Sequence, residues 1–129
     1  MWIDDNMDAV GPEAIKRRIL IVEDEALIAM MLEDMVEMLG FDIAGVAGSV
    51  AEAMDIIQTG TLIDAALLDV NVGGDRVYPV ADLLVTAKIP FIFSTGYGRA
   101  GVEARFQGAP VLGKPFDLPM LASALSTLS

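Results

Sequence analysis

The sequence predicts an α/β protein built on an open, doubly wound sheet of five parallel strands. Two observations support this fold class. Short apolar runs alternate with segments of helical periodicity, and the alternation repeats along nearly the whole chain. Strands separated by helices are joined by right-handed crossovers, which produce a parallel sheet with helices on both faces. Five strands are too few for an eight-stranded barrel, so we expect the sheet to stay open.

The first half of the predicted domain contains two strands and two helices. Residues 19–22 form an apolar run that ends abruptly in acids, as buried parallel strands do. Residues 26–39 carry apolar side chains on one side and acids on the other, and a glycine follows as a helix cap. Residues 41–47 are typical of a second strand. Ser49 then begins a capping box that predicts a helix over residues 50–58.

The middle of the chain continues the same alternation. Residues 63–68 are apolar and predict a third strand, which ends at Asp69. Residues 70–75 contain two adjacent glycines and predict a loop. A third helix is expected over residues 77–88, where a proline is tolerated in the first turn. Residues 90–94 predict the fourth strand.

The last part of the chain completes the predicted sheet. Residues 95–101 are rich in glycine and predict a loop, and residues 102–107 are expected to form a short fourth helix. Residues 111–113 predict the fifth strand, and Asp117 can cap a final helix. The acidic segment 1–17 is interpreted as a flexible extension, which leaves residues 18–129 as the domain.

Composition excludes several kinds of chemistry. The chain has 129 residues, of which 54% are apolar, and its net charge is −11. This acidity argues against nucleic acid and an anionic membrane surface as partners, because both require a basic face. The absence of cysteine and histidine excludes thiol catalysis, a Ser-His-Asp triad and a phosphohistidine carried by the chain itself. No signal peptide or membrane-spanning run is evident, so a cytoplasmic location is expected.

Charged or polar side chains stand where the predicted strands end. Glu23 and Asp24 follow the first strand, Asp69 ends the third, Thr95 follows the fourth and Lys114 follows the fifth. Ligands of open parallel sheets bind beyond these carboxyl ends. Acids brought together there repel one another unless a cation lies among them, and carboxylate oxygens suit Mg²⁺. The alternative is that the acids after the first strand only begin the next helix, where the helix dipole favours them.

Four segments of the chain together resemble the signatures of the response-regulator receiver domain. They are Ile-Leu-Ile-Val-Glu-Asp-Glu at residues 19–25, Ala-Leu-Leu-Asp-Val-Asn at 66–71, Phe-Ile-Phe-Ser-Thr-Gly at 91–96 and Leu-Gly-Lys-Pro-Phe at 112–116. The resemblance extends from about Arg18 to the C-terminus. It implies a flavodoxin-like receiver fold with strand order 2-1-3-4-5.

The resemblance also implies a role for each matching residue. Asp69 corresponds to the phosphoacceptor of a two-component system or phosphorelay. Asp24 and Asp69 would bind Mg²⁺ directly together with the backbone carbonyl of Asn71, and Glu23 would bind it directly or through water.

Two further residues are assigned to the phosphoryl group by the same resemblance. Lys114 would pair with its oxygens, and the peptide bond between Lys114 and Pro115 is expected to be cis. Thr95 would donate a hydrogen bond to the group and move when it arrives. The phosphoryl group would come from a histidine kinase or a histidine phosphotransfer protein and would switch contacts with an unknown downstream protein.

One receiver subgroup carries Phe-Ala-Thr-Gly-X-Tyr after the fourth strand and often works with histidine kinases of the HWE type. This chain is similar there, but Ser94 replaces the alanine and Tyr97 stands one place early. Val111 occupies the position where many receivers carry a switching aromatic residue. Thr95, Gly96 and Tyr97 are therefore the predicted switch residues.

Two other functions remain open from the sequence. A Mg²⁺-dependent phosphoryl hydrolase would carry an acid two residues after Asp69, where this chain has Asn71. A receiver that is never phosphorylated would act only through protein contacts. The expectation is a phosphoacceptor that is not itself an enzyme.

Overall fold

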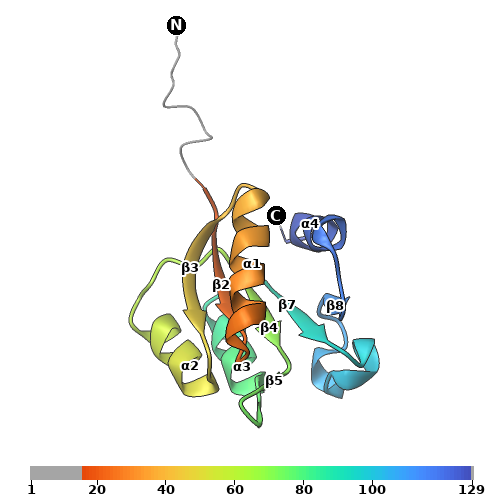
Figure 1. Ribbon diagram of the computed structural model, residues 1–129. Helices are drawn as coiled ribbons and strands as arrows, with labels where there is room; N and C mark the ends of the chain where they lie inside the picture. Colours follow the sequence, from red (N-terminus) through yellow and green to blue (C-terminus); the bar gives the residue numbers. More distant parts are fainter. Residues whose placement is uncertain (1–15, 129) are drawn as a thin grey trace, which may run out of the picture.

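The computed structural model describes residues 16–128, and a five-stranded parallel sheet lies at the centre of this part of the chain (Figure 1). The sheet order is β3-β2-β4-β7-β8. Counted along the chain, this is the order 2-1-3-4-5, so the predicted fold class is confirmed. The predicted extension 1–17 lies outside the described residues except for its last two. The sheet strands are β2 (Arg18–Val22), β3 (Asp42–Ala47), β4 (Ala65–Asp69), β7 (Phe91–Thr95) and β8 (Val111–Gly113).

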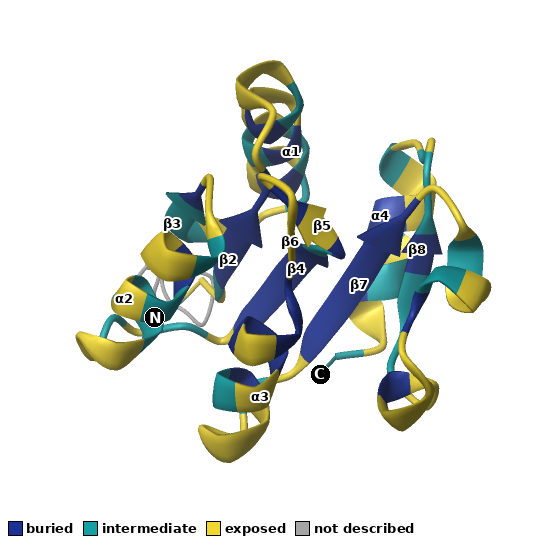
Figure 2. Cartoon of the chain, turned by 90° about the horizontal axis from the view of Figure 1, so that it is seen from below, coloured by how far each residue is buried: buried dark blue, intermediate teal, exposed yellow. Residues whose placement is uncertain are grey.

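Helices cover both faces of the sheet, and the three central strands are almost entirely buried (Figure 2). The α-helices of the described residues are α1 (Ala26–Met38), α2 (Val50–Gln58), α3 (Tyr78–Thr86) and α4 (Leu118–Ser126). Side chains alternate between the two faces along each strand. One apolar cluster lies between the sheet and the helices α2 and α3, and the other lies between the sheet and the helices α1 and α4.

Two predicted helix starts are confirmed by their caps. The Ser49 hydroxyl accepts a hydrogen bond from the Glu52 backbone N–H at 3.1 Å, and the Glu52 carboxylate accepts one from Gly48 N–H at 2.6 Å. The Asp117 carboxylate accepts from Met120 N–H at 3.0 Å at the start of α4. These side chains satisfy backbone donors that have no partner within the helix.

The prediction of a simple loop over residues 70–75 was wrong. The strands β5 (Asn71–Val72) and β6 (Asp75–Arg76) form a small antiparallel hairpin there. Gly73 and Gly74 form its two-residue turn with φ angles of 59° and 87°. A turn with positive φ at both central residues matches the twist of a hairpin, and glycine adopts it without strain. The Gly-Gly pair was the sequence signal for this element.

The predicted fourth helix over residues 102–107 was also wrong. Two short 3₁₀ helices, η2 (Gly98–Gly101) and η3 (Ala104–Phe106), connect β7 to β8 instead. The segment between Gly101 and Gly108 is too short to offset the cost of nucleating an α-helix, and flanking glycines add to that cost.

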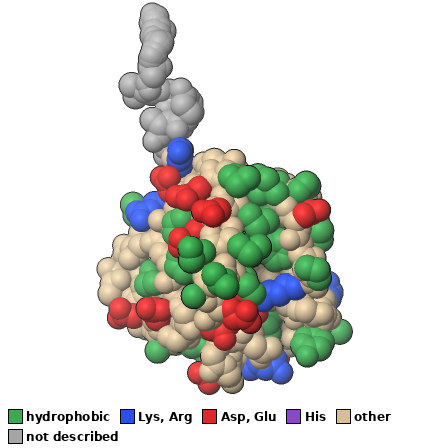
Figure 3. All heavy atoms as spheres, in the orientation of Figure 1, with side chains coloured by type: hydrophobic (Ala, Val, Ile, Leu, Met, Phe, Trp, Pro, Cys, Tyr) green, Lys and Arg blue, Asp and Glu red, His purple; other side chains and the backbone are tan. Residues whose placement is uncertain are grey.

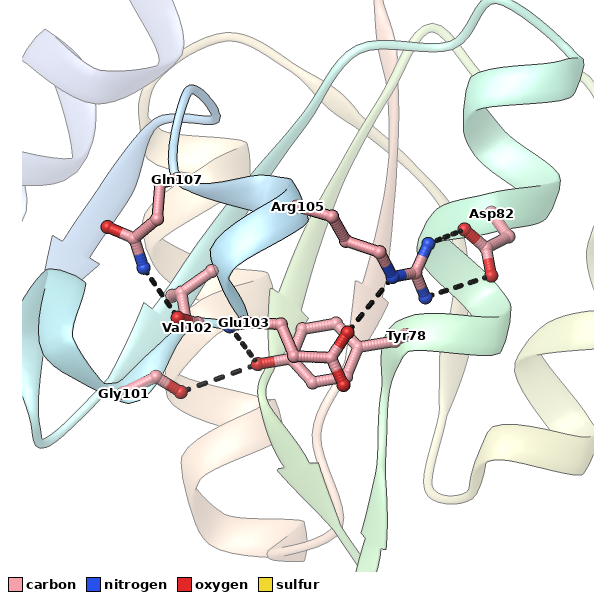
Figure 4. A network of polar contacts seen from close by, with 7 residues as sticks. All are labelled: Tyr78, Asp82, Gly101, Val102, Glu103, Arg105 and Gln107. Atoms are coloured by element: carbon pink, nitrogen blue, oxygen red, sulfur yellow. Dashed lines mark hydrogen bonds and ion pairs between the residues drawn. The ribbon is translucent and has the colours of Figure 1, made fainter.

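Tyr78 of α3 contacts the segment that connects β7 to β8 and holds it against the rest of the domain (Figure 4). Its hydroxyl accepts a hydrogen bond from Glu103 N–H at 2.8 Å and donates one to the Gly101 carbonyl at 3.4 Å. Its ring stacks on Phe106 with a centroid distance of 5.5 Å. A buried tyrosine therefore holds both 3₁₀ helices against α3.

We expect Tyr78→Phe to lower the free energy of unfolding by about 1–2 kcal/mol, because a backbone donor and a carbonyl lose their partner. Urea unfolding measures this change. The control is Tyr97→Phe, which removes the hydroxyl of a tyrosine that is 77% exposed and should change stability by less than about 0.5 kcal/mol. Equal effects of the two variants would contradict the fastening role of Tyr78.

No helix in the part of the chain from residue 16 to 128 combines the length and apolar character needed to span a bilayer.

Candidate functional site

The acids predicted to meet at the carboxyl ends of the strands do meet. Glu23 and Asp24 follow β2, Asp69 ends the neighbouring strand β4, and one carboxylate oxygen from each lies within 4.8 Å of the others. Glu23 is buried, Asp69 is half-buried and Asp24 is exposed. The parallel pairing of β2 with β4 brings these acids together although they are more than forty residues apart in the sequence.

Lys114 is the cation that faces this cluster. It follows β8, and its Nζ lies 3.3 Å from Asp69 Oδ2 and 3.5 Å from Glu23 Oε1. The peptide bond between Lys114 and Pro115 is cis, as the receiver resemblance implies. One ammonium group thus contacts two of the three clustered carboxylates.

The electrostatics of the site disfavour a full set of negative charges. Burial raises the pKa of the Glu23 carboxyl above its usual range, and the Asp69 charge raises it further. Burial also raises the pKa of Asp69, against the lowering effect of Lys114. Both shifts mean that ionising these two carboxyl groups is less favourable in the folded site than in water, chiefly because the site is buried.

The β5–β6 hairpin closes one side of the cluster. Gly73 N–H donates a hydrogen bond to Asp24 Oδ2 at 3.0 Å, which connects the hairpin turn to the acids that follow β2. Asn71 begins the hairpin, and its backbone N–H donates to the Asp69 carboxylate, which lowers the pKa of that group. The predicted role of the Asn71 carbonyl as a metal ligand stays a prediction.

The donor set fits Mg²⁺. All three clustered side chains offer carboxylate oxygens, the ligands that hard divalent cations prefer. The exposed position of Asp24 leaves one side open for the water molecules that Mg²⁺ retains. A bound cation would also favour the ionised forms of Glu23 and Asp69, whose pKa values burial raises.

The predicted switch residues lie beside the cluster at the end of β7. Thr95 is buried, and its hydroxyl accepts a hydrogen bond from Tyr97 N–H at 3.1 Å. Tyr97 itself is exposed. The Thr95 carbonyl accepts from Lys114 N–H at 2.9 Å, so the backbone connects the threonine to the lysine.

Gly101 is a residue of this site that the sequence interpretation did not single out. A Cβ atom added to it would lie 2.9 Å from Thr95 Oγ1 and 2.9 Å from Tyr97 Cβ. The absence of a side chain therefore lets η2 pack directly on the predicted switch. Its place in the glycine-rich segment 96–101 was the available signal, but that pattern alone did not show which glycine contacts the threonine.

An apolar surface adjoins the cluster on the α1 side of the sheet. Exposed apolar side chains gather over α1 (Figure 3), namely Leu27, Met30, Met31 and Met38. A groove of about 400 Å³ runs beside them between α1 and the segment 114–116, which connects β8 to α4. Its lining includes Met31, Met35 and Phe116, and it reaches Lys114. The groove therefore extends from an apolar helix face to the charged site.

A five-stranded parallel sheet with order 2-1-3-4-5, an acid cluster and a lysine at the carboxyl ends of its strands defines the receiver class of signalling domain. The response regulator receiver domain family matches residues 19–126. The chain belongs to this family, as the sequence resemblance indicates.

The relatives of this chain include PhyR and SdrG proteins. PhyR of Methylorubrum extorquens, a phyllosphere-induced regulator, is 35% identical over 130 residues, which cover 96% of this chain and 49% of PhyR. The solution structure of SdrG from Sphingomonas melonis Fr1 is 48% identical and superposes with a TM-score of 0.77, covering 88% of this chain and 96% of SdrG. PhyR from Bartonella quintana, described as an anti-anti-sigma factor, is 30% identical with a TM-score of 0.73 over 88% of this chain and 47% of its own. The chain thus spans about half the length of these PhyR proteins.

Proposed function

We propose that this receiver domain accepts a phosphoryl group on Asp69 and thereby switches its protein contacts. The observation that carries the proposal is the position of Lys114 Nζ, 3.3 Å from the Asp69 carboxylate, beside an acid cluster that fits Mg²⁺. A carboxylate nucleophile, a cation site and an ammonium group are the elements that phosphoryl transfer to a carboxylate requires.

Each residue would contribute a distinct part of the chemistry. An Asp69 oxygen attacks phosphorus and forms an acyl phosphate, while the bond to the leaving group of the donor breaks. Lys114 neutralises charge on the phosphoryl oxygens, and Thr95 turns its hydroxyl from its local contact with Tyr97 N–H toward the same group. Movement of Thr95 would change the close approach of Gly101 to its hydroxyl, so the connection between β7 and β8 would rearrange.

Asp24, Asp69 and Glu23 would hold Mg²⁺, with the Asn71 carbonyl as a further ligand. When bound, Mg²⁺ supplies positive charge that offsets repulsion between the carboxylates and the incoming phosphoryl oxygens.

The donor would be a separate protein, since the chain has no histidine. A histidine kinase or histidine phosphotransfer protein would place its phosphohistidine at Asp69. The apolar surface of α1 and its groove offer a docking face next to Lys114. A kinase of the HWE type is the candidate that the predicted switch segment suggests. The chain would meet its downstream partner in the cytoplasm and would not itself be an enzyme, since Asn71 stands where a hydrolase would carry an acid.

The direct test is to incubate the protein with a small acyl phosphate and Mg²⁺ and to measure its intact mass. We expect the mass of one added phosphoryl group, and we expect no addition when EDTA is present throughout the incubation. An unchanged mass in the presence of Mg²⁺ would overturn the proposal.

A further inference from the structure

Ser94 presents a buried hydroxyl that lacks a hydrogen-bond partner beside the proposed phosphoacceptor. The side chain is 3% exposed, and its Oγ is the buried side-chain polar atom found without a partner among the described residues. Leaving a buried hydroxyl unpaired costs free energy, so such atoms in a folded protein call for an explanation. Ser94 also stands where the receiver subgroup with Phe-Ala-Thr-Gly-X-Tyr carries alanine.

The strand register places Ser94 next to Asp69. The two residues are direct partners in the parallel pairing of β4 with β7. Directly paired residues of neighbouring strands project from the same face of a sheet, and those strands lie about 4.8 Å apart. Leu67 and Ile92, two residues earlier on the same strands, both pack on the face that α1 and α4 cover. Ser94 therefore shares the α1 and α4 face with Asp69.

The Lys114 side chain spans β7, the strand that carries Ser94. Lys114 follows β8, whereas its partner Asp69 ends β4 and its partner Glu23 follows β2, so β7 lies between the lysine and both acids. Two strand spacings amount to about 10 Å, so the lysine side chain must pass over β7 to reach Asp69. Ser94 on β7 thus lies in the path between the lysine backbone and the acids, where a small side chain is needed.

Ser94 and Thr95 differ in the face on which they lie. Successive residues of a strand point to opposite faces. Thr95 shares its side with Phe93 and contacts η2, whereas Ser94 points to the α1 and α4 side. The Thr95 hydroxyl already accepts a hydrogen bond, and the Ser94 hydroxyl has none. Two hydroxyl groups therefore flank the end of β7 from opposite faces, and the unpaired one is adjacent to Asp69.

We propose that Ser94 is a further positioning residue of the site, whose hydroxyl donates a hydrogen bond to an oxygen of the modified Asp69 side chain once the phosphoryl group is attached. This inference rests on the proposed phosphoacceptor function. The unmodified domain holds the hydroxyl unpaired, and modification brings new acceptor oxygens within reach. The bond therefore stabilises the modified state selectively and shifts the equilibrium toward it.

The experiment measures binding of beryllofluoride, a phosphoryl mimic that the relative SdrG binds in its activated conformation, at saturating Mg²⁺. Calorimetry on Ser94→Ala should show about tenfold weaker binding than wild type, the loss expected for one hydrogen bond to a charged group. Ser94→Cys, with a weak donor of similar shape, should fall between them. The control Ser123→Ala removes an exposed hydroxyl on α4 and should bind like wild type.

Thermal unfolding without beryllofluoride separates this role from a purely structural one. Because the hydroxyl has no partner in the unmodified state, the melting temperature of Ser94→Ala should equal or exceed that of wild type. A lower melting temperature, or unchanged beryllofluoride affinity, would overturn the role of Ser94. If wild type neither binds beryllofluoride nor gains a phosphoryl group, the proposed function itself fails.

Discussion

Asp69→Asn is expected to reduce phosphoryl incorporation from a small acyl phosphate to background. The carboxamide is not a competent nucleophile toward phosphorus, and it carries no charge to pair with Lys114 or a cation. Intact mass measurement in the presence of Mg²⁺ provides the result. Asparagine has nearly the same size as aspartate, and it removes a charge whose burial is unfavourable, as the raised pKa of Asp69 shows. The variant should therefore fold.

The matched control for this prediction is Asp75→Asn. Asp75 lies in β6 close in sequence to Asp69, but it is exposed and stands outside the acid cluster. This variant makes the same chemical change and should incorporate phosphoryl groups like wild type. Incorporation that persists in Asp69→Asn would place the phosphoacceptor elsewhere.

The second large effect is expected for Lys114→Gln. Removing the cation leaves Glu23 and Asp69 without the ammonium group that contacts both. Breaking a buried ion pair costs about 3–5 kcal/mol, and partial exposure of Lys114 reduces this to about 1–3 kcal/mol at pH 7. Urea unfolding at several pH values measures the loss.

The pH dependence of this loss has a defined sign. The pKa values of Glu23 and Asp69 are raised in the folded protein, first by burial. Between the unfolded and folded values the folded protein binds more protons, so the free energy of unfolding falls as the pH rises through that window. Lys114 lowers both pKa values, so its removal should raise them further. The pH range over which stability falls should then extend to higher pH. The loss in Lys114→Gln should therefore shrink on acidification toward pH 4.

Lys88→Gln is the control for net charge, because Lys88 is exposed on a different part of the domain. Its stability should stay within about 0.5 kcal/mol of wild type at every pH. A loss in Lys114→Gln that is equal at pH 4 and pH 7 would show that the lysine acts through packing of its aliphatic stem rather than through charge.

At this site the balance of charge and the proposed chemistry depend on the same residues. The acids that would hold a cation also repel one another, and Lys114 offsets only part of that repulsion. Under the proposed function, a phosphoryl group would add negative charge at the same place. Its arrival would therefore favour a rearrangement that brings donors such as Lys114, Thr95 and Ser94 closer to Asp69.

The fold class and the meeting of the acids with Lys114 follow from the sequence. Buried parallel strands must be apolar, and the polar residues that end them must gather at one edge of the sheet. The order of the strands and the residue at the end of each are enough to predict that Glu23, Asp24, Asp69 and Lys114 lie together. The structure confirms this prediction.

Other features were decided by the tertiary structure. Three such features are the close approach of Gly101 to Thr95, the 3₁₀ connection bonded to Tyr78 and the unpaired hydroxyl of Ser94. They depend on the register between strands and on the packing of η2. Local sequence patterns describe a residue through its chain neighbours, whereas these contacts join segments whose approach is set by the whole core. Register across the sheet, rather than periodicity along the chain, thus placed the Ser94 hydroxyl beside Asp69.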